Sequence, residues 1–220
     1  QEEGKEDSSY CDTSLVMSVL ALLVAGVDTT SLTIKFCLTF IAHFPDVQAK
    51  VQQEIDEVIG SQSLPKITDR AQMPYTSAVI HELQRLLDMT PIGLFHAVTE
   101  DVQFRGYTIP KGTTIITNLT SVLFDPSQWE TPEEFNPGHF LDANGNFRAK
   151  SAFMAFSAGN RSCVGQVQVH MVLFLIFTSL LQKFTFRGPP GTAKLDCDYL
   201  RNHKGEVFSS EICAIPRNAM

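Results

Sequence analysis

The sequence predicts an α+β fold built mainly from helices, and three observations support this prediction. Helical hydrophobic patterns or continuous apolar residues cover most of residues 14–87. β-Branched and aromatic residues dominate two short runs between residues 103 and 117, and an uninterrupted apolar helix follows at residues 164–183. With 220 residues, 44% of them apolar, the chain can bury a core and does not have the composition of a disordered protein.

The first predicted element is a long helix at residues 14–44, preceded by a polar leader at residues 1–13. The helix is apolar around most of its circumference, which is typical of a helix buried inside a large protein. Its uncharged run at residues 13–27, like the run at 171–181, is shorter than the roughly 20 apolar residues that a membrane span needs. Because the chain starts with Gln1 and a polar leader, we expect it to be the back part of a longer protein.

Three further helices are predicted before the strands: residues 47–59, a short one near residues 68–70, and residues 75–87. Pro45 and Asp46 end the first helix and open the second, and Gly60 closes the second as its C′ residue. The helix at 75–87 ends before Pro91, because a residue that precedes proline is driven out of the helical region.

After Pro91 the sequence predicts strands and then loops. The runs 103–109 and 113–117, joined by a turn at 110–112, predict a small antiparallel sheet. Residues 124–162 are rich in turn signals. A loop of this length is uncommon in a compact domain, so we expect the segment to wrap around a partner that orders it, such as a large buried cofactor. The final apolar helix at 164–183 follows, and the tail from Phe184 is predicted to form short strands and turns.

Charge and cysteine content exclude several classes of protein. A net charge of −7 leaves no overall basic footprint for nucleic acid. The five cysteines are an odd number without a C-x-x-C pair, which argues against a disulfide framework or structural zinc and favours a reducing compartment. Four of them are predicted to be small buried hydrophobic residues: Cys11, Cys37, Cys197 and Cys213.

Cys163 differs from the other cysteines because it comes directly before the final apolar helix, between Gly159 and Gly165. The N–H groups and dipole at a helix N-terminus favour a thiolate, and a single thiolate can be an axial haem ligand. The glycines allow the backbone to approach a flat partner, and Arg161 is placed for an anionic group at its edge. The alternative is a buried thiol in a glycine turn, which explains neither Arg161 nor the glycines.

Two other segments combine polar and apolar residues in patterns that indicate chemistry. In the long helix, Gly26 and Thr29 predict a local loosening that could hold dioxygen, with Asp28 linked to a proton supply; the alternative is a solvated polar patch. Glu82 and Arg85 share one helix face, either as a surface pair of little value or as a buried pair that needs further partners.

These segments resemble the cytochrome P-450 family. Residues 156–165 match its haem-loop pattern F-x-x-G-x-R-x-C-x-G at every fixed position, residues 25–30 resemble its oxygen-activating helix, and Glu82 with Arg85 resembles its E-x-x-R pair. Residues 135–140 resemble its meander, with His139 where Arg is more usual. The resemblance covers about residues 14–217 and points to the microsomal type of animal family 2. It implies the C-terminal part of that fold: long central helix, E-x-x-R helix, small β-sheets, meander, haem-thiolate loop and final buried helix, with the N-terminal half absent.

The resemblance implies a haem-thiolate monooxygenase that inserts one oxygen atom from O₂ into a lipophilic small molecule. Electrons would come from NADPH-cytochrome P-450 reductase, at the cytoplasmic face of the endoplasmic reticulum membrane, with a membrane anchor that is absent from this chain. Nucleic acid is not an expected partner. The implied iron ligand is Cys163, with Thr29 and Asp28 as catalytic residues. The implied haem contacts are His96, Phe156, Gly159, Arg161 and Gly165. The implied structural residues are Glu82, Arg85 and His139. The implied substrate contacts are Leu22, Ala25, Ile92, Leu94, Phe95 and Phe208.

Four residues after the haem-loop pattern depart from the family: Gln166, Val169, His170 and Val172. Val169 replaces a usual Ala and is expected to crowd the haem, while His170 and Val172 remove charges that help a reductase to dock. One alternative is therefore a truncated, catalytically inactive fragment that binds haem poorly. An isomerase-like or peroxide-using enzyme is disfavoured, because Asp28 and Thr29 are both intact.

Overall fold

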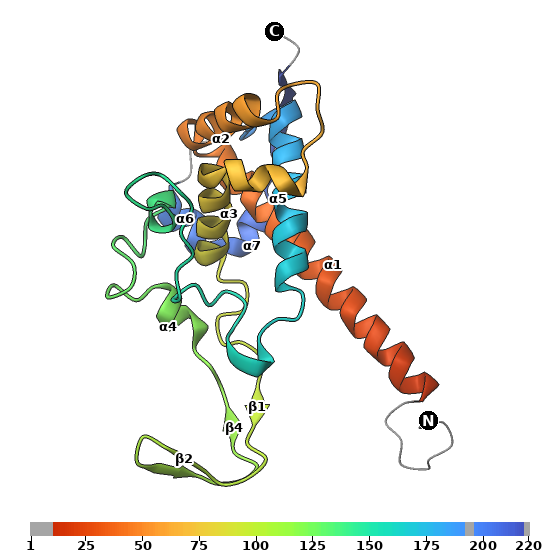
Figure 1. Cartoon of the computed structure of the whole chain (residues 1–220), viewed down its shortest axis with the longest axis vertical. Helices are drawn as coiled ribbons and strands as arrows, with labels where there is room; N and C mark the ends of the chain where they lie inside the picture. Colours follow the sequence, from red (N-terminus) through yellow and green to blue (C-terminus); the bar gives the residue numbers. More distant parts are fainter. Residues whose placement is uncertain (1–10, 192–195, 218–220) are drawn as a thin grey trace.

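A computed structural model of the protein describes residues 11–191 and 196–217, so most of the predicted polar leader lies outside the described residues. It is an α+β structure made mainly of helices, with small sheets (Figure 1). The helices are α1 (Asp12–Ala42), α2 (Pro45–Val58), α3 (Pro74–Leu87), α4 (Leu119–Leu123), α5 (Gln166–Lys183), α6 (Cys197–Asn202) and α7 (Lys204–Ser209), with 3₁₀ turns η1 (Ile67–Gln72), η2 (Pro137–Phe140) and η3 (Gly159–Arg161). The strands are β1 (His96–Ala97), β2 (Val102–Phe104), β3 (Tyr107–Ile109), β4 (Thr114–Ile115), β5 (Phe184–Arg187) and β6 (Cys213–Pro216).

The four longest helices lie close to where the sequence places them. Helix α1 begins at Asp12, so the last two residues of the predicted leader belong to it, and Pro45 is the first residue of α2. Gly60 follows α2 with a φ of +73°, and its N–H donates to the carbonyl of Ile55 at 3.1 Å. A left-handed residue that recovers a helix carbonyl is the C′ role predicted for this glycine.

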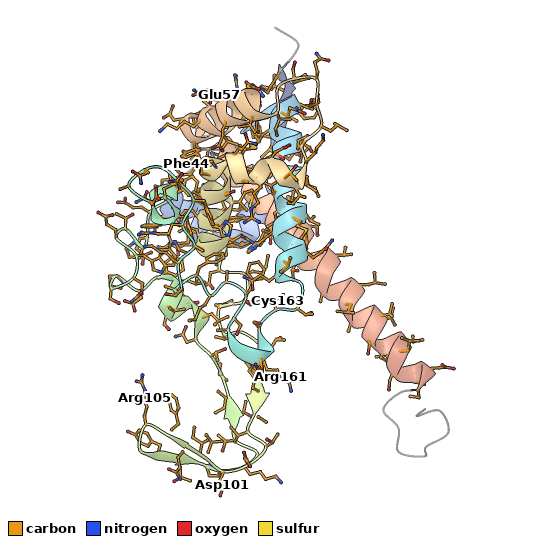
Figure 2. All side chains as sticks on the ribbon, viewed as in Figure 1. Phe44, Glu57, Asp101, Arg105, Arg161 and Cys163 are labelled. Carbon is orange, nitrogen blue, oxygen red and sulfur yellow. The ribbon has the colours of Figure 1, made fainter. Side chains whose placement is uncertain are left out.

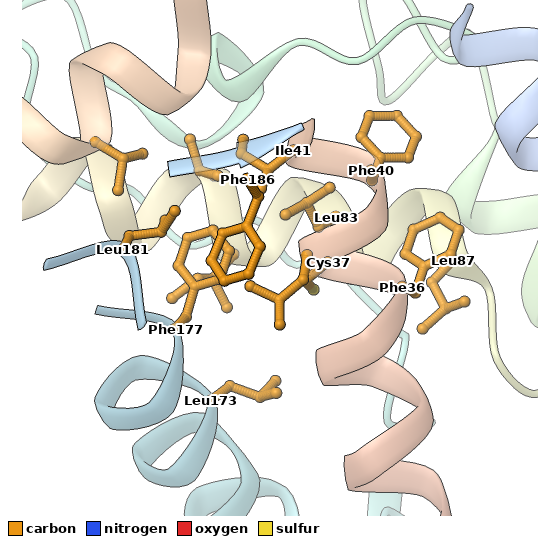
Figure 3. Close-up of a cluster of buried hydrophobic side chains, with 14 of the residues drawn as sticks. Phe36, Cys37, Phe40, Ile41, Leu83, Leu87, Leu173, Phe177, Leu181 and Phe186 are labelled. Carbon is orange, nitrogen blue, oxygen red and sulfur yellow. The ribbon is translucent and has the colours of Figure 1, made fainter. Parts of the chain in front are cut away.

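The main hydrophobic core lies where the C-terminal part of α1 packs against α3, α5 and β5 (Figure 3). Phe36, Phe40 and Leu83 are fully buried there, together with Leu181 of α5. Each such side chain contributes about 1.5–3 kcal/mol by leaving water. The apolar residues of α5 and of the second half of α1 thus form much of the main hydrophobic core.

The N-terminal half of α1 is exposed, which corrects the expectation that the whole helix is buried. Leu15, Leu22 and Val27 are each more than half exposed, and Figure 1 shows this part of α1 extending away from the other helices. By length and composition the 31-residue helix is long enough to cross a membrane. This differs from the sequence analysis, which found the uncharged run at residues 13–27 too short for a span. The second half of the helix, however, is buried in the protein core. The exposed half presents apolar side chains with no described segment packed on them.

The strand pairing differs from the prediction. β2 and β3 form an antiparallel hairpin inside the run that was predicted to be one strand, with Phe104 opposite Tyr107, while β4 pairs with β1. The hairpin turn consists of Arg105 and Gly106, both with positive φ, which is the two-residue geometry that matches strand twist. The predicted turn at residues 110–112 exists, but it connects β3 to β4 without pairing them.

Two further corrections concern loops. The described part of the tail contains the short helices α6 and α7 as well as the strands β5 and β6. The long loop region at 124–162 is organised by protein groups: a second small core formed by Ala78, Trp129, Phe140 and Ala152, with the Trp129 indole donating to the carbonyl of Val122 at 2.8 Å. These contacts thus order the part of the segment between Trp129 and Ala152.

Candidate cofactor site

The loop at residues 156–165 presents the Cys163 thiol to solvent immediately before α5 (Figure 2). The Cys163 N–H donates to the Phe156 carbonyl at 2.9 Å, and the Cys163 carbonyl accepts from the N–H of Gln166, the first residue of α5, at 3.3 Å. These two bonds close the loop on one side and join it to the helix on the other. The sulfur is thus held near a helix N-terminus, where the helix dipole favours an anion.

The two glycines of the loop have different physical roles. Gly159 has a φ of +73°, a conformation that L side chains rarely adopt, so the turn itself requires glycine. Gly165 has a normal φ, and a Cβ at this position would contact the Cys163 sulfur at 3.8 Å. Glycine at 165 therefore leaves open space beside the thiol, as expected where a flat partner approaches closely.

The other cysteines are in different environments from Cys163. Burial raises the pKa of Cys37 to about 12 and that of Cys197 to about 11, so both remain thiols near neutral pH. Cys11 is exposed, which corrects the expectation that it is buried, and hydrogen bonds with Ser14 lower its pKa. Cys213 is partly buried at the start of β6. Cys163 alone among the five combines an exposed sulfur with the glycine loop.

The accessible Cys163 sulfur fits a haem that has one protein ligand. Arg161 is exposed in η3, and His96 is partly exposed in β1, opposite Ile115. Within residues 11–191 and 196–217, no three His, Cys, Asp or Glu side chains gather in a way that could hold a metal ion. A porphyrin supplies four of its own nitrogen ligands, so a single accessible thiolate is the donor set that haem requires. Phe156 is half-buried beneath the loop.

Thr29 and Asp28 lie on the exposed half of α1, far along the chain from Cys163 and without a described contact to it. The Thr29 hydroxyl donates to the Ala25 carbonyl at 2.7 Å, and the Thr33 hydroxyl donates to the Thr29 carbonyl at 2.7 Å. Helix α1 is continuous through Gly26, so the predicted local distortion of the helix does not go beyond the hydroxyl bonds to the Ala25 and Thr29 carbonyls. Asp28, Thr29 and the apolar residues that precede them on α1 are all exposed in the described chain.

The predicted Glu82–Arg85 pair is fully buried, and it has the further partners that burial demands. Arg85 binds the Glu82 carboxylate in a bidentate manner, at 2.8 Å through Nε and 2.7 Å through Nη2. Its remaining donors reach backbone carbonyls of the long loop region: Leu123 at 2.9 Å, Pro132 at 2.7 Å and Glu134 at 3.1 Å. The pair therefore pins helix α3 to the loop region by hydrogen bonds that replace lost hydration.

His139 completes this network in one tautomer. Its Nε2 accepts the Thr131 N–H at 3.2 Å, so the ring proton is on Nδ1, which donates to Glu82 at 3.2 Å. Burial raises the pKa of Glu82, but the hydrogen bonds from Arg85 and His139 outweigh it and leave the pKa below its ordinary value. Glu82 is thus an anion whose charge is fully compensated, with the Asn136 N–H as a further donor at 3.0 Å.

The residues predicted to contact substrate lie on three segments of the described chain. Five are exposed on α1 or on the segment before β1: Leu22, Ala25, Ile92, Leu94 and Phe95. Phe208 lies in α7, where its ring centroid is 6.3 Å from that of Phe36 of α1, at the edge of the main core.

The four departures after the loop fall at different depths. Val169 packs against the main core, and Val172 and Gln166 are half-buried. His170 is packed among aromatic rings and touches His81 of α3, a contact that the sequence analysis missed. The sequence carries no local signal for this contact, because the two histidines lie on α3 and α5 and meet only through the packing of those helices.

Comparisons with known proteins identify the family to which the chain belongs. The family model described as cytochrome P450 matches residues 1–206. Cytochrome P450 2C3 of Oryctolagus cuniculus is 46% identical over 217 residues, covering 98% of this chain and 44% of the relative. Cytochrome P450 2D6 of Homo sapiens is 47% identical, covering 98% and 43%, and cytochrome P450 2K1 of Oncorhynchus mykiss is 50% identical, covering 99% and 43%. The chain spans less than half the length of these relatives.

Proposed function

The chain belongs to the cytochrome P450 family, whose members bind haem through a thiolate-ligated iron, and we propose that it is the haem-ligating part of a microsomal monooxygenase. The reaction inserts one oxygen atom from O₂ into a lipophilic small molecule. Electrons come from NADPH-cytochrome P-450 reductase at the cytoplasmic face of the endoplasmic reticulum. The observation that carries this proposal is the exposed Cys163 sulfur in its glycine loop at the start of α5.

In this proposal Cys163 is the single protein ligand of the iron. When bound, the haem supplies dioxygen binding and electron transfer, and the anionic sulfur increases the electron density at the metal. The chain places that sulfur near the N-terminus of α5, and the hydrogen bond from the Cys163 backbone N–H to the Phe156 carbonyl holds the loop that carries it. Arg161 and His96 are the donors proposed for the carboxylates at the edge of the cofactor.

Thr29 and Asp28 are the residues proposed to manage protons. Because the Thr29 hydroxyl proton is directed at the Ala25 carbonyl, its oxygen lone pairs remain able to accept a proton-bearing group. Asp28 has an exposed carboxylate on the adjacent residue and can exchange protons with water. With haem bound, the two side chains would pass protons between water and the reacting group, the Thr29 hydroxyl turning away from the Ala25 carbonyl in order to donate.

Glu82, Arg85 and His139 are proposed as positioning residues rather than catalytic ones. They are fully or almost fully buried and make their bonds to one another and to backbone groups between residues 123 and 136. Their role is to hold that loop region against α3, so that the haem loop has a rigid support. The side chains proposed to face a lipophilic substrate are apolar: Leu22, Ala25, Ile92, Leu94, Phe95 and Phe208.

A second candidate is favoured by the exposure of the site. In the described chain Leu94 is 79% exposed and the N-terminal half of α1 is open to solvent, so these 220 residues alone cover little of a haem. A fragment that binds haem poorly and turns over no substrate is the alternative to an active enzyme. Haem titration of the 220-residue chain separates the two, since weak or absent binding favours the fragment.

The proposal is tested by the absorption spectrum of the haem-loaded longer protein that contains this chain. Reduction under carbon monoxide is expected to give the red-shifted Soret band of a thiolate-ligated haem, and Cys163→Ser is expected to abolish that band. Cys213→Ser is the matched control, because it removes a thiol outside the loop, and it should keep the band. A red-shifted band that survives Cys163→Ser would show that the ligand is another residue.

A further inference from the structure

Beneath the Cys163 loop lies a cluster of two imidazoles and two phenyl rings: His81, Phe153, Phe156 and His170. The His170 ring centroid lies 4.8 Å from that of His81 and 5.0 Å from that of Phe156, with the Phe156 ring perpendicular to it. Phe153 lies 5.2 Å from His81 and 6.5 Å from His170. Edge-to-face packing at these separations is an attractive arrangement of aromatic rings.

This cluster connects helix α3 to the backbone of Cys163. His81 is fixed by its Nδ1, which bonds the Ser77 carbonyl at 2.7 Å. The His170 ring on α5 packs between His81 and Phe156, and the Phe156 carbonyl accepts the Cys163 N–H at 2.9 Å. Each link is a direct contact, so displacement of the His170 ring removes a support of Phe156 and of the bond that Phe156 makes.

We propose that His170 is a positioning residue, whose neutral ring packs between His81 and Phe156 and fixes the loop that carries Cys163. This proposal depends on the proposed function in one respect: the loop matters because it carries Cys163, the proposed iron ligand. It concerns His170, one of the four residues at which this chain departs from the family pattern.

Two observations show that His170 is used for its shape. Burial, with a smaller effect of the positive charge of Arg70, lowers the pKa of His81 to about 3 and that of His170 to about 4, so both rings are neutral near pH 7. The Nε2 atom of His170 is buried and has no hydrogen-bond partner in the part of the chain that the structure describes. A neutral ring with an unused polar atom contributes packing surface rather than charge or hydrogen bonding.

The test is the exchange rate of the Cys163 amide hydrogen, measured by NMR on the 220-residue chain labelled with ¹⁵N-cysteine. His170→Ala is expected to raise this rate about tenfold, because Phe156 loses its support and its carbonyl releases the Cys163 N–H more often. The Cys37 amide, in the buried part of α1, is the internal reference and should not change. His170→Phe restores a ring of similar shape and is expected to return the Cys163 rate to within about twofold of the original.

The matched control is His203→Ala, which removes another histidine packed on an aromatic ring, 4.1 Å from Tyr199 and remote from the loop in sequence. It should leave the Cys163 amide unchanged. An unchanged Cys163 rate in His170→Ala, an equal rise at Cys37, or failure of His170→Phe to restore the rate would each overturn the proposal. Since the measurement needs no haem, its outcome is independent of whether Cys163 ligates the iron, which the carbon monoxide spectrum decides.

Discussion

At the scale of single residues, the buried pair Glu82–Arg85 has the largest consequences for stability. Arg85 makes five hydrogen bonds, two to the carboxylate and three to backbone carbonyls, and none of its side chain is exposed. Removing one charge leaves the other buried without compensation, which is far more costly than losing an exposed pair.

Glu82→Gln is therefore expected to lower the free energy of unfolding by about 3–5 kcal/mol, measured by urea denaturation. The matched control is Asp198→Ala, which breaks an i,i+3 pair with Arg201 in which the carboxylate is 75% exposed. It should cost less than about 1 kcal/mol, because surface pairs are screened by water. Equal costs for the two variants would contradict the inference that the Glu82–Arg85 pair is desolvated.

The buried imidazoles predict a loss of stability in acid. The pKa of His170 falls to about 4 and that of His81 to about 3 on burial, so between about pH 6.5 and pH 4 the unfolded chain binds more protons than the folded chain. Their contribution is therefore complete above about pH 6.5 and is lost as the pH falls toward 4. His170→Phe should flatten the dependence of Tm on pH in this window; an unchanged slope would show that His170 does not contribute to it.

At the scale of elements, residues with strong local constraints are the ones that the sequence predicts well. Pro45 begins α2, Gly60 ends it, and the apolar run at the C-terminus becomes α5, because proline geometry, left-handed glycine and hydrophobic periodicity act locally. Local signals did not decide which strands pair: the Arg105–Gly106 turn divides one predicted strand into β2 and β3. The Cys163 loop was found from its motif, whereas the contact between His81 and His170 depends on how α3 and α5 pack.

Two glycines in helical contexts should respond in opposite directions to alanine. Gly60→Ala forces a side chain into a φ of +73° and is expected to lower the free energy of unfolding by about 1 kcal/mol. Gly205→Ala, inside α7 and with open space around its added Cβ, is expected to raise it by about 0.5–1 kcal/mol. Urea denaturation of both variants measures the difference, and a destabilised Gly205→Ala would contradict the assignment of α7.

At the scale of the whole molecule, a folded core and an exposed apolar helix are part of the same chain. The C-terminal half of α1 is buried against α3 and α5, while Leu15, Leu22 and Leu23 on its N-terminal half are each more than half exposed. A contiguous apolar surface of this kind is the sort that associates with other surfaces in water. The sequence indicated an apolar helix, but only the structure shows which half of it the described chain covers.

The 220-residue chain is therefore expected to self-associate as its concentration rises, measured by sedimentation velocity. Replacing Leu15 and Leu22 together by Ser should shift the association to at least about tenfold higher concentration, because the apolar area on the helix is reduced. Replacing Leu64, which is also exposed but lies in the loop after α2, is the control and should have little effect. A monomer at all concentrations would contradict an exposed α1.

The central claim, that the Cys163 sulfur is the protein ligand of a haem iron, is tested most directly by X-ray absorption at the iron edge. The sample is the haem-loaded longer protein that contains this chain. We predict one sulfur neighbour of the iron beside the porphyrin nitrogens, and its loss in Cys163→Ser. An iron without a sulfur neighbour in the unmodified protein, or one that keeps its sulfur in Cys163→Ser, would contradict the claim.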